Sequence, residues 1–437
     1  MMIRSFRWHM TDGIVPPSGC ISNPYFLWQI ALSFKLFGVN EFTLRLPSVI
    51  MSSLLVLIGY RSGKLLVNQQ VGFYTGFLIC TSFFLIEITS GRQMVDHNDV
   101  AFLFYTSASI WSWVEYIHSK KKFWIILIGL FAGFAILCKW LVGLLVYLGW
   151  GIYNIQIHRL QLIKYKEIFY SLLITFTIIL PWQFLIFTRY PAEASQAFRY
   201  NALHFTEEIE GHGGAVWFYF NHFQDLYGKI AAYFVIPALI ILFFKIKNRP
   251  MRAAFLALPI AVYLFFTLAS TKIPGYPFIV ALPILLSFAV LLSLVFDLIR
   301  KIPIKDRITG TFLVLLAVVI GYLNLEPQRI IEKHSLNIVT NEYSQIQLHN
   351  KAIFQELTAT FPENSVVFNI KGRHYVECMF YSGFPSYSFI PSEEQLNELI
   401  AEGRKAVVIA TDRDQLPDYL TSNKNVIIFN RIIKGWE

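Results

Sequence analysis

"FLICTSFFLIEITSGRQMVDHNDVAFLFYTSASIW", residues 77–111, joins two apolar runs through a short polar stretch. Together with its neighbouring residues, each run is long enough to cross the hydrocarbon core of a bilayer, which takes roughly 20 residues of helix. The polar stretch, residues 91–99, holds an arginine, a histidine and two aspartates. The pattern therefore predicts two transmembrane helices with ionisable groups gathered at the membrane surface between them.

The composition of the whole chain agrees with this pattern. Of the 437 residues, 55% are hydrophobic and only 15% are charged, whereas soluble domains carry about 25% charged residues. The formal net charge is +9, but the basic residues fall in short clusters between apolar runs, which is typical of membrane orientation and not of nucleic-acid binding. The four cysteines form no CxxC pair, so they predict neither a disulfide framework nor a zinc site. We expect a polytopic α-helical membrane protein.

Hydrophobic periodicity predicts ten transmembrane helices. Most Lys and Arg residues of the connections fall in one alternate set, which the positive-inside rule places in the cytoplasm. The connection at residues 91–99 and the long connection at residues 188–229 therefore face outward. The predicted spans are 44–66, 71–89, 99–118, 122–137, 140–156, 168–187, 230–245, 252–269, 274–297 and 309–325.

Two further segments flank the spans. Residues 1–43 are amphipathic, and "PYFLWQIALSFKLFG" at 24–38 predicts a helix lying in the interface at the outer face. Residues 44–326 are the transmembrane domain. Residues 327–437 have the character of a small soluble α/β domain on the extracytoplasmic side, since helix-like stretches alternate with β-branched runs at 365–370, 405–411 and 425–430.

The ionisable side chains gather at the outer ends of the spans, where such costly residues usually mark a site. Four outer connections contribute them. A lipid-phosphate leaving group needs positive charge as its bond to a sugar breaks, and an acceptor hydroxyl needs a carboxylate to take its proton. Cations and carboxylates in one cavity therefore predict glycosyl transfer from a lipid-linked donor. The residues are Arg92, Asp96, His97, Asp99, Lys139, His204, Glu207, Glu208, Glu210, His212, Lys272 and Tyr276.

Structural interpretations of the same residues stay open. Arg92 and Asp96 can form an ion pair at a helix end, and Lys139 and Lys272 can anchor lipid headgroups. His204 and His212 with the nearby glutamates resemble a metal constellation only loosely. A secondary transporter or lipid flippase is the alternative function, although such proteins tend to show two related halves and broken helices at matching positions.

Five stretches in order resemble one family, the C-type membrane glycosyltransferases, in the branch of dolichyl- or polyprenyl-phosphate-sugar-dependent enzymes that holds bacterial aminoarabinose transferases and protein O-mannosyltransferases. Residues 10–50, with "FGVNEFTLRLPS", resemble the family's first outer loop. Asp99 in "GRQMVDHNDVAFLFY" matches the acid of an "R.....D" element. The others are "GFAILCKWLVGLL", "EGHGGAVWFYF" and "STKIPGYPFIVALPIL", and the resemblance covers about residues 10–290.

The resemblance implies an inverting single displacement. It implies Asp99 and Asp96 as catalytic acids, Arg92, Lys139 and Lys272 as contacts of the donor phosphate with Tyr276 as a hydrogen-bonding neighbour, and His204 and His212 near the acceptor. The chain also departs from the family. The acidic pair of the first outer loop and the first transmembrane helix would fall before Met1, and Ser22 and Asn23 replace an expected lysine. We therefore expect an N-terminally truncated sequence.

The leading hypothesis is a transferase that moves a hexose-type sugar from polyprenyl phosphate to a lipid A, glycan or protein acceptor on the outer face of a bacterial inner membrane. Its partners would be membrane lipid, the lipid-linked donor and the acceptor, without nucleic acid. The lipid-linked sugar donor is the expected cosubstrate, no metal residue is assigned, and a divalent metal is left as an alternative. A catalytically incomplete remnant of such an enzyme is the remaining alternative.

Overall fold

The structure is a computed structural model that describes residues 24–91, 98–139, 141–209, 211–302, 306–332, 342–370, 374–410 and 415–435. Among the candidate residues, Arg92, Asp96, His97 and Glu210 lie outside these ranges. The chain divides into two compact units, one built mainly from Phe42–Ile330 and one mainly from Ile331–Glu437. Each unit is described by itself.

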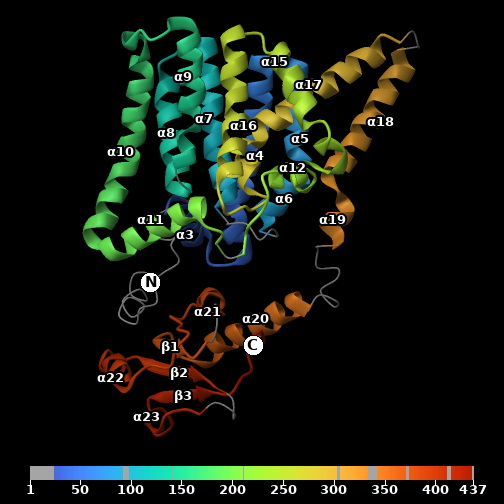
Figure 1. The fold of residues 1–437 in the computed structure, drawn as a ribbon. Helices are drawn as coiled ribbons and strands as arrows, with labels where there is room; N and C mark the ends of the chain where they lie inside the picture. Colours follow the sequence, from blue (N-terminus) through green and yellow to red (C-terminus); the bar gives the residue numbers. More distant parts are fainter. Residues whose placement is uncertain are drawn as a thin grey trace. The chain divides into compact units, whose positions relative to one another are not determined.

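The first unit is a bundle of helices that run up and down, joined by short connections (Figure 1). Its long helices follow the predicted apolar runs, because a helix is the only open chain form that satisfies its own backbone in lipid. They are α4 (Glu41–Leu66), α5 (Gln69–Cys80), α6 (Phe83–Ser90), α7 (Asp99–Ser119), α8 (Phe123–Cys138), α9 (Leu145–His158), α10 (Lys166–Arg189), α15 (Val235–Lys245), α16 (Arg249–Leu268), α17 (Ala281–Arg300) and α18 (Asp306–Leu325).

Six helices among the described residues are long and apolar enough to cross a membrane, or seven when α5 and α6 count as one broken span. The chain thus has multiple apolar helices of spanning length, whereas the predicted count of ten is not confirmed. α8 and α15 are apolar but shorter. α7 is long, but polar Ser and Thr side chains interrupt its apolar surface. The number of spans predicted from the sequence is larger because the apolar pattern alone assigns α7, α8 and α15 as spans.

α7 lies in the middle of the bundle and is buried on nearly all sides. The Ser109 hydroxyl donates a hydrogen bond of 3.0 Å to the Ile128 carbonyl of α8, which links the two helices. A turn at Lys120, with a φ of 57°, sends the chain directly into α8. Because α7 and α8 are antiparallel neighbours, the first residue of α7 lies at the same end of the bundle as the residue after α8.

The predicted span at 71–89 is a broken helix. α5 ends at Cys80 and α6 begins at Phe83, with a bend of 46° between them. The Ser82 hydroxyl caps α6 by accepting from the Leu85 amide, and the Thr81 hydroxyl bonds to the Phe77 carbonyl. Hydroxyl groups that bond locally to the backbone compete with the helix ladder, which accounts for the break at this pair.

Shorter helices cover the end of the bundle that carries the candidate residues. α3 (Tyr25–Phe37) falls within the predicted amphipathic helix, with Phe26 and Ile30 buried and Leu32 and Leu36 exposed. Its position in a membrane interface stays a prediction. α11 follows α10, and short helices lead on toward α15, while η3 precedes α17. Their bounds are α11 (Pro191–Thr206), α12 (Phe218–Asn221), α13 (Phe223–Tyr227), α14 (Lys229–Ala232), η1 (Leu141–Leu144) and η3 (Tyr276–Val280), whereas η2 (Leu162–Tyr165) joins α9 to α10 at the opposite end.

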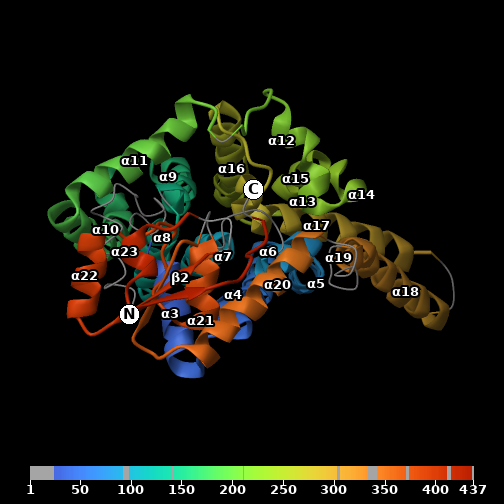
Figure 2. The ribbon, with the colours of Figure 1, turned by 90° about the horizontal axis from the view of Figure 1, so that it is seen from below.

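α18 stands at the margin of the bundle in both views (Figures 1 and 2), and α19 (Pro327–Glu332) follows it. Only 11% of its apolar window is buried, against 78% for the window that contains α17. Its exposed side chains are apolar, among them Phe312, Leu315 and Val319, as expected for a helix that faces lipid. α18 therefore depends on few contacts for its position.

The second unit contains a parallel sheet in the order β1–β2–β3. The strands fall on the three predicted β-branched runs and are covered by helices on both faces: Val367 and Val407 lie in one hydrophobic cluster, Val366 and Val408 in another. The predicted boundaries of this domain and its extracytoplasmic position stay predictions. The elements are β1 (Ser365–Phe368), β2 (Lys405–Ile409), β3 (Val426–Phe429), α20 (Glu342–Thr360), α21 (His374–Ser382), α22 (Glu393–Ala401) and α23 (Asp418–Thr421).

Candidate active site

Two of the predicted residues form an ion pair at the α7–α8 end of the bundle. Asp99 is the first residue of α7, and Lys139 follows the last residue of α8. The Lys139 ammonium donates to the Asp99 carboxylate, and the two side chains are 19% and 12% exposed. Beside this pair, the Asn98 amide donates a hydrogen bond of 2.6 Å to the Cys138 carbonyl. Two adjacent contacts therefore fix the start of α7 against the end of α8.

The helix ends favour these charges. A carboxylate is stabilised at the N-terminus of a helix and a cation at its C-terminus, each by about 0.3–1 kcal/mol. Asp99 and Lys139 occupy those positions on α7 and α8. Because the pair is only slightly exposed, removing either charge leaves the other in a poorly solvated place.

Tyr276 is the third predicted residue at this point. Its ring centroid lies 4.6 Å from the Lys139 ammonium, which is a cation–π contact. The ring also packs against Phe266 of α16, with 5.3 Å between centroids. The sequence predicts hydrogen bonding by the hydroxyl, whereas the structure presents the ring face to the ammonium. The cluster of Asp99, Lys139 and Tyr276 thus joins three of the four connections that hold the candidate residues.

Lys272 belongs to the same connection as Tyr276, but its ammonium has other partners. The side chain is buried and donates to the carbonyls of Thr267 at 2.8 Å and Ala269 at 2.6 Å, which caps the end of α16. Burial lowers the pKa of Lys272, and the nearby Glu208 opposes this shift. Two ammonium hydrogens are thus used within the loop, and a contact with donor phosphate stays a prediction.

The fourth of these connections joins this loop through backbone hydrogen bonds. The Thr271 amide donates to the His204 carbonyl at 3.0 Å, and the Lys272 amide donates to the His212 carbonyl at 2.8 Å. The Thr271 hydroxyl adds a bond to the Glu207 carbonyl at 2.8 Å and accepts one from the Ile209 amide at 3.1 Å. The connections at 204–212 and 270–272 are therefore bound together.

The two histidines do not form one centre. The His204 ring lies 5.2 Å from the Tyr200 ring in an edge-on contact, and His212 is exposed. Within the described ranges, no three His, Cys, Asp or Glu side chains are grouped in a way that would hold a metal ion. The roles of His204 and His212 toward the acceptor stay predictions.

Arg45, which packs on Gly91, is a candidate residue that the sequence analysis missed. Gly91 ends α6 with a φ of 72°, and a Cβ built there would lie 2.1 Å from the guanidinium carbon of Arg45. The Arg45 side chain thus packs on the glycine. Arg45 is only partly exposed, and no carboxylate among the described residues forms an ion pair with it.

A signal for Arg45 is present in the sequence, since Arg45 lies inside the predicted span at 44–66. Ionisable residues within spans are rare and usually functional or paired. The same criterion singles out Glu87 in the span at 71–89, which was also missed.

Comparisons with known proteins give matches of family and fold. The family model for dolichyl-phosphate-mannose-protein mannosyltransferase matches residues 20–184. An undecaprenyl phosphate-α-4-amino-4-deoxy-L-arabinose arabinosyl transferase of Pseudomonas fluorescens is 24% identical over 279 residues, which are 61% of this chain and 48% of that protein. The chain thus spans about half the length of this curated relative.

Two solved structures have a similar fold. ArnT from Cupriavidus metallidurans bound to undecaprenyl phosphate matches with a TM-score of 0.61 at 16% identity, over 93% of this chain and 79% of ArnT. The oligosaccharyltransferase AglB from Archaeoglobus fulgidus, in complex with an inhibitory peptide and a dolichol-phosphate, matches with a TM-score of 0.50 at 14% identity, over 85% and 56% of the two chains. Residues 20–184 thus match a membrane glycosyltransferase family, and the chain shares the fold of ArnT.

Proposed function

We propose that this chain transfers a hexose-type sugar from a polyprenyl-phosphate donor to a cell-envelope acceptor. The observation that carries the proposal is the cluster of Asp99, Lys139 and Tyr276, in which a carboxylate and a cation from different connections meet at one end of the bundle. Lipid A, a glycan and a protein remain the candidate acceptors. A bacterial inner membrane is the proposed location, with the site on the extracytoplasmic side because the other connections hold most of the basic residues.

The proposed step is an inverting displacement. The acceptor hydroxyl attacks the anomeric carbon, the bond from that carbon to the phosphate oxygen breaks, and the phosphate leaves with the electron pair. Lys139 stabilises the charge that develops on the leaving phosphate, as a preorganised cation does in a poorly solvated site. The acceptor proton goes to a carboxylate base.

The carboxylates have different parts in this scheme. Asp99 is held by the Lys139 ammonium, and a carboxylate in an ion pair is a weak base, so we assign Asp99 to orienting Lys139 and the acceptor. Asp96, the second predicted catalytic residue, is the candidate base that takes the acceptor proton. Arg45 is proposed as a further phosphate contact, because a guanidinium binds phosphate with two parallel hydrogen bonds.

The test is transfer by the purified protein in vesicles. The protein is incubated with radiolabelled polyprenyl-phosphate sugars and cell-envelope fractions, and the labelled product is isolated. We expect label in one fraction, inversion at the anomeric carbon by NMR, and loss of transfer in the Lys139→Met variant. Uptake of a substrate into vesicles without any transfer would instead support the transporter alternative and contradict the proposal.

A further inference from the structure

The second unit has an open cleft between α22 and α23. Its volume is about 500 Å³, which lies in the range of pockets that hold small ligands. Both helices pack on the same face of the sheet, because Leu396 of α22 and Leu420 of α23 belong to one hydrophobic cluster. The residues that line the cleft include Glu393, Leu396, Asn397, Tyr419, Asn423 and Lys424.

One wall of the cleft is α22, and the fold holds this helix in place. The Ser392 hydroxyl accepts a hydrogen bond from the Gln395 amide at 3.3 Å, and the Gln395 side chain accepts one from the Ser392 amide at 2.8 Å. This capping box fixes the first turn of α22. Leu396, which is 1% exposed, anchors the next turn in the core. Glu393 and Asn397 therefore project from a well-held helix, one turn apart and on the same face.

The other wall includes the turn after α23. The Ser422 hydroxyl donates to the Asp418 carbonyl at 2.6 Å, at the end of the helix. The Asn423 side-chain oxygen then accepts from the Asn425 amide at 2.9 Å. An asparagine that bonds to the backbone two residues on holds such a turn in one conformation. The turn that carries Lys424 is thus ordered without a ligand.

Tyr419 offers its ring to the cleft. Its hydroxyl donates to the Pro391 carbonyl at 2.8 Å, so that group is already used. The side chain is only partly exposed and packs against the cluster that contains Leu396 and Leu420. A fixed aromatic ring of this kind contacts an apolar face of a ligand at little cost in conformational entropy.

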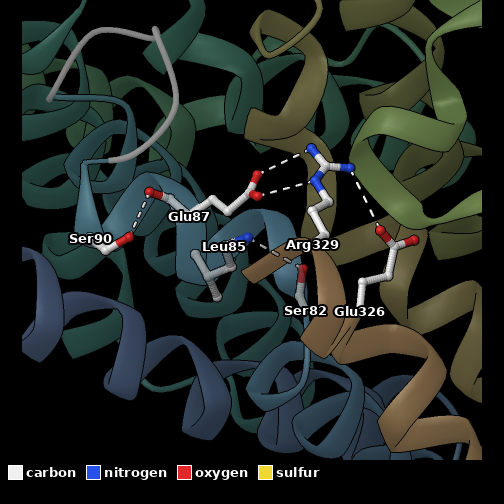
Figure 3. A network of polar contacts seen from close by, with 6 residues as sticks. All are labelled: Ser82, Leu85, Glu87, Ser90, Glu326 and Arg329. Carbon is white, nitrogen blue, oxygen red and sulfur yellow. Dashed lines mark hydrogen bonds and ion pairs between the residues drawn. The ribbon is translucent and has the colours of Figure 1, made fainter. Parts of the chain in front are cut away.

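Three polar side chains of the cleft have unused hydrogen-bonding capacity. Within the described ranges, the Glu393 carboxylate, the Asn397 amide and the Lys424 ammonium have no hydrogen-bond or ion-pair partner in the chain. Glu87 of α6 shows the opposite case, because Arg329 occupies its carboxylate with two bonds of 3.1 Å each (Figure 3). Since Glu393 and Lys424 line one cleft without pairing, an acceptor and a donor stay available to a ligand.

The groups in the cleft restrict the class of ligand. A phosphate or another anion would be repelled by the Glu393 carboxylate, and a divalent cation would be repelled by the Lys424 ammonium. An apolar ligand would cover these polar groups without replacing their hydrogen bonds to water. A saccharide suits all of them, because its hydroxyls both donate and accept hydrogen bonds and the C–H face of its ring can pack on Tyr419.

We propose that the cleft between α22 and α23 is a binding site for a neutral oligosaccharide. One sugar ring packs on Tyr419, while Glu393, Asn397 and Lys424 form hydrogen bonds with its hydroxyls. The open side of the cleft leaves room for the neighbouring sugars. The site belongs to the second unit alone, and saccharide binding there does not depend on the transfer reaction proposed above.

The first test is saccharide binding by the full-length protein in phosphatidylcholine nanodiscs, because detergents with sugar headgroups would compete for the cleft. Fluorescently labelled tetrasaccharides of glucose, mannose, galactose and N-acetylglucosamine are titrated by anisotropy. We expect saturable binding of at least one of them, and at least tenfold weaker binding of its phosphorylated form. The proposal is overturned if no neutral tetrasaccharide binds at millimolar concentration, or if the phosphorylated form binds more tightly.

The second test locates the bound saccharide with matched variants. Glu393→Ala/Asn397→Ala removes two hydrogen-bonding groups from the cleft. Glu394→Ala/Glu398→Ala is the control, since it changes the next residue in each case, and both of these are exposed and do not line the cleft. We expect affinity at least tenfold weaker in the first variant and within twofold of the parent in the control. Equal affinity in the two variants would refute the site.

The third test concerns the ring of Tyr419. Tyr419→Phe keeps the ring and loses only the bond to Pro391, so affinity should stay within threefold of the parent. Tyr419→Leu removes the aromatic face and should weaken binding at least tenfold, with the melting temperature measured for both variants. Equal affinity in the two would contradict packing of a sugar on this ring. If Tyr419→Leu unfolds, the Glu393→Ala/Asn397→Ala variant still decides the proposal, and these measurements stand whether or not the parent transfers sugar.

Discussion

The ion pair of Lys139 with Asp99 gives the sharpest prediction, the effect of Lys139→Met. Methionine keeps most of the length and the apolar contacts of the lysine, and removes the charged ammonium with its hydrogen-bond donors. If Lys139 stabilises the leaving phosphate, its loss should slow transfer by about 10²–10³-fold, the cost of removing one preorganised donor from a developing anion. The Tyr276 ring would lose its cation at the same time.

The same change should also reduce stability, and the structure sets its size. Removing one partner of a fully buried pair costs about 3–5 kcal/mol. Asp99 and Lys139 retain 12% and 19% of their exposure, and the Asp99 carboxylate stays at the N-terminus of α7, so we expect a smaller loss of about 1–2 kcal/mol. In Asp99→Asn/Lys139→Met the unpaired charge is gone, and most of this loss should be recovered.

The assay is single-turnover transfer at saturating donor, with thermal unfolding in the same detergent. Lys64→Met is the matched control, because Lys64 also lies over a tyrosine ring, that of Tyr60 at 5.8 Å, but on the last turn of α4. We expect the control to keep transfer within twofold. If Lys139→Met transfers sugar within threefold of the parent rate while its free energy of unfolding falls as expected, the assignment of Lys139 to the leaving group is refuted.

Three further outcomes follow from the same structure. Arg45→Gln should weaken binding of polyprenyl phosphate about tenfold, the effect of one charge-assisted contact, in an equilibrium binding assay with tritiated lipid; unchanged affinity would exclude Arg45 as a phosphate contact. Gly91→Ala should lower the free energy of unfolding by about 2 kcal/mol through its positive φ and the Arg45 guanidinium, whereas Gly38→Ala, with a φ of 82° and open space around it, should lose only about half of that; equal losses would contradict the packing of Arg45. Burial lowers the pKa of Lys272 in the folded state, so the unfolded chain binds more protons above that pKa. This group should therefore make stability rise with pH up to about 10.5, the unperturbed value. The pH profile of the melting temperature should lose this rise in Lys272→Met, and identical profiles in the parent and the variant would refute the prediction.

Local sequence patterns predicted the positions of the helices and strands well. The predicted apolar runs fall where the structure has helices, and the predicted β-branched runs of the second unit fall where it has strands. The number of spans was harder to predict. α7 and α8 are distinguished from the other helices by their burial in the bundle, which length and hydropathy do not show. Periodicity cannot separate a helix buried in protein from one that faces lipid.

The candidate site shows the same division. Positive-inside patterning grouped Asp99, Lys139 and Tyr276 at outer ends, and the structure brings these three into contact. In the structure, the Lys272 ammonium instead donates hydrogen bonds to the carbonyls at the end of α16. No sequence pattern could separate these two lysines, because each lies in a short connection between two apolar runs.

The sequence by itself determined that this is a helical membrane chain and predicted which connections carry candidate site residues, because hydrophobicity and charge can be read locally along the chain. Only the tertiary structure decided the partners: Lys139 with Asp99, Arg45 on Gly91, and Glu87 with Arg329, which is 242 positions away. An ion pair depends on distances of a few ångströms, and helices far apart in sequence reach such distances only when their packing has fixed where each helix end lies.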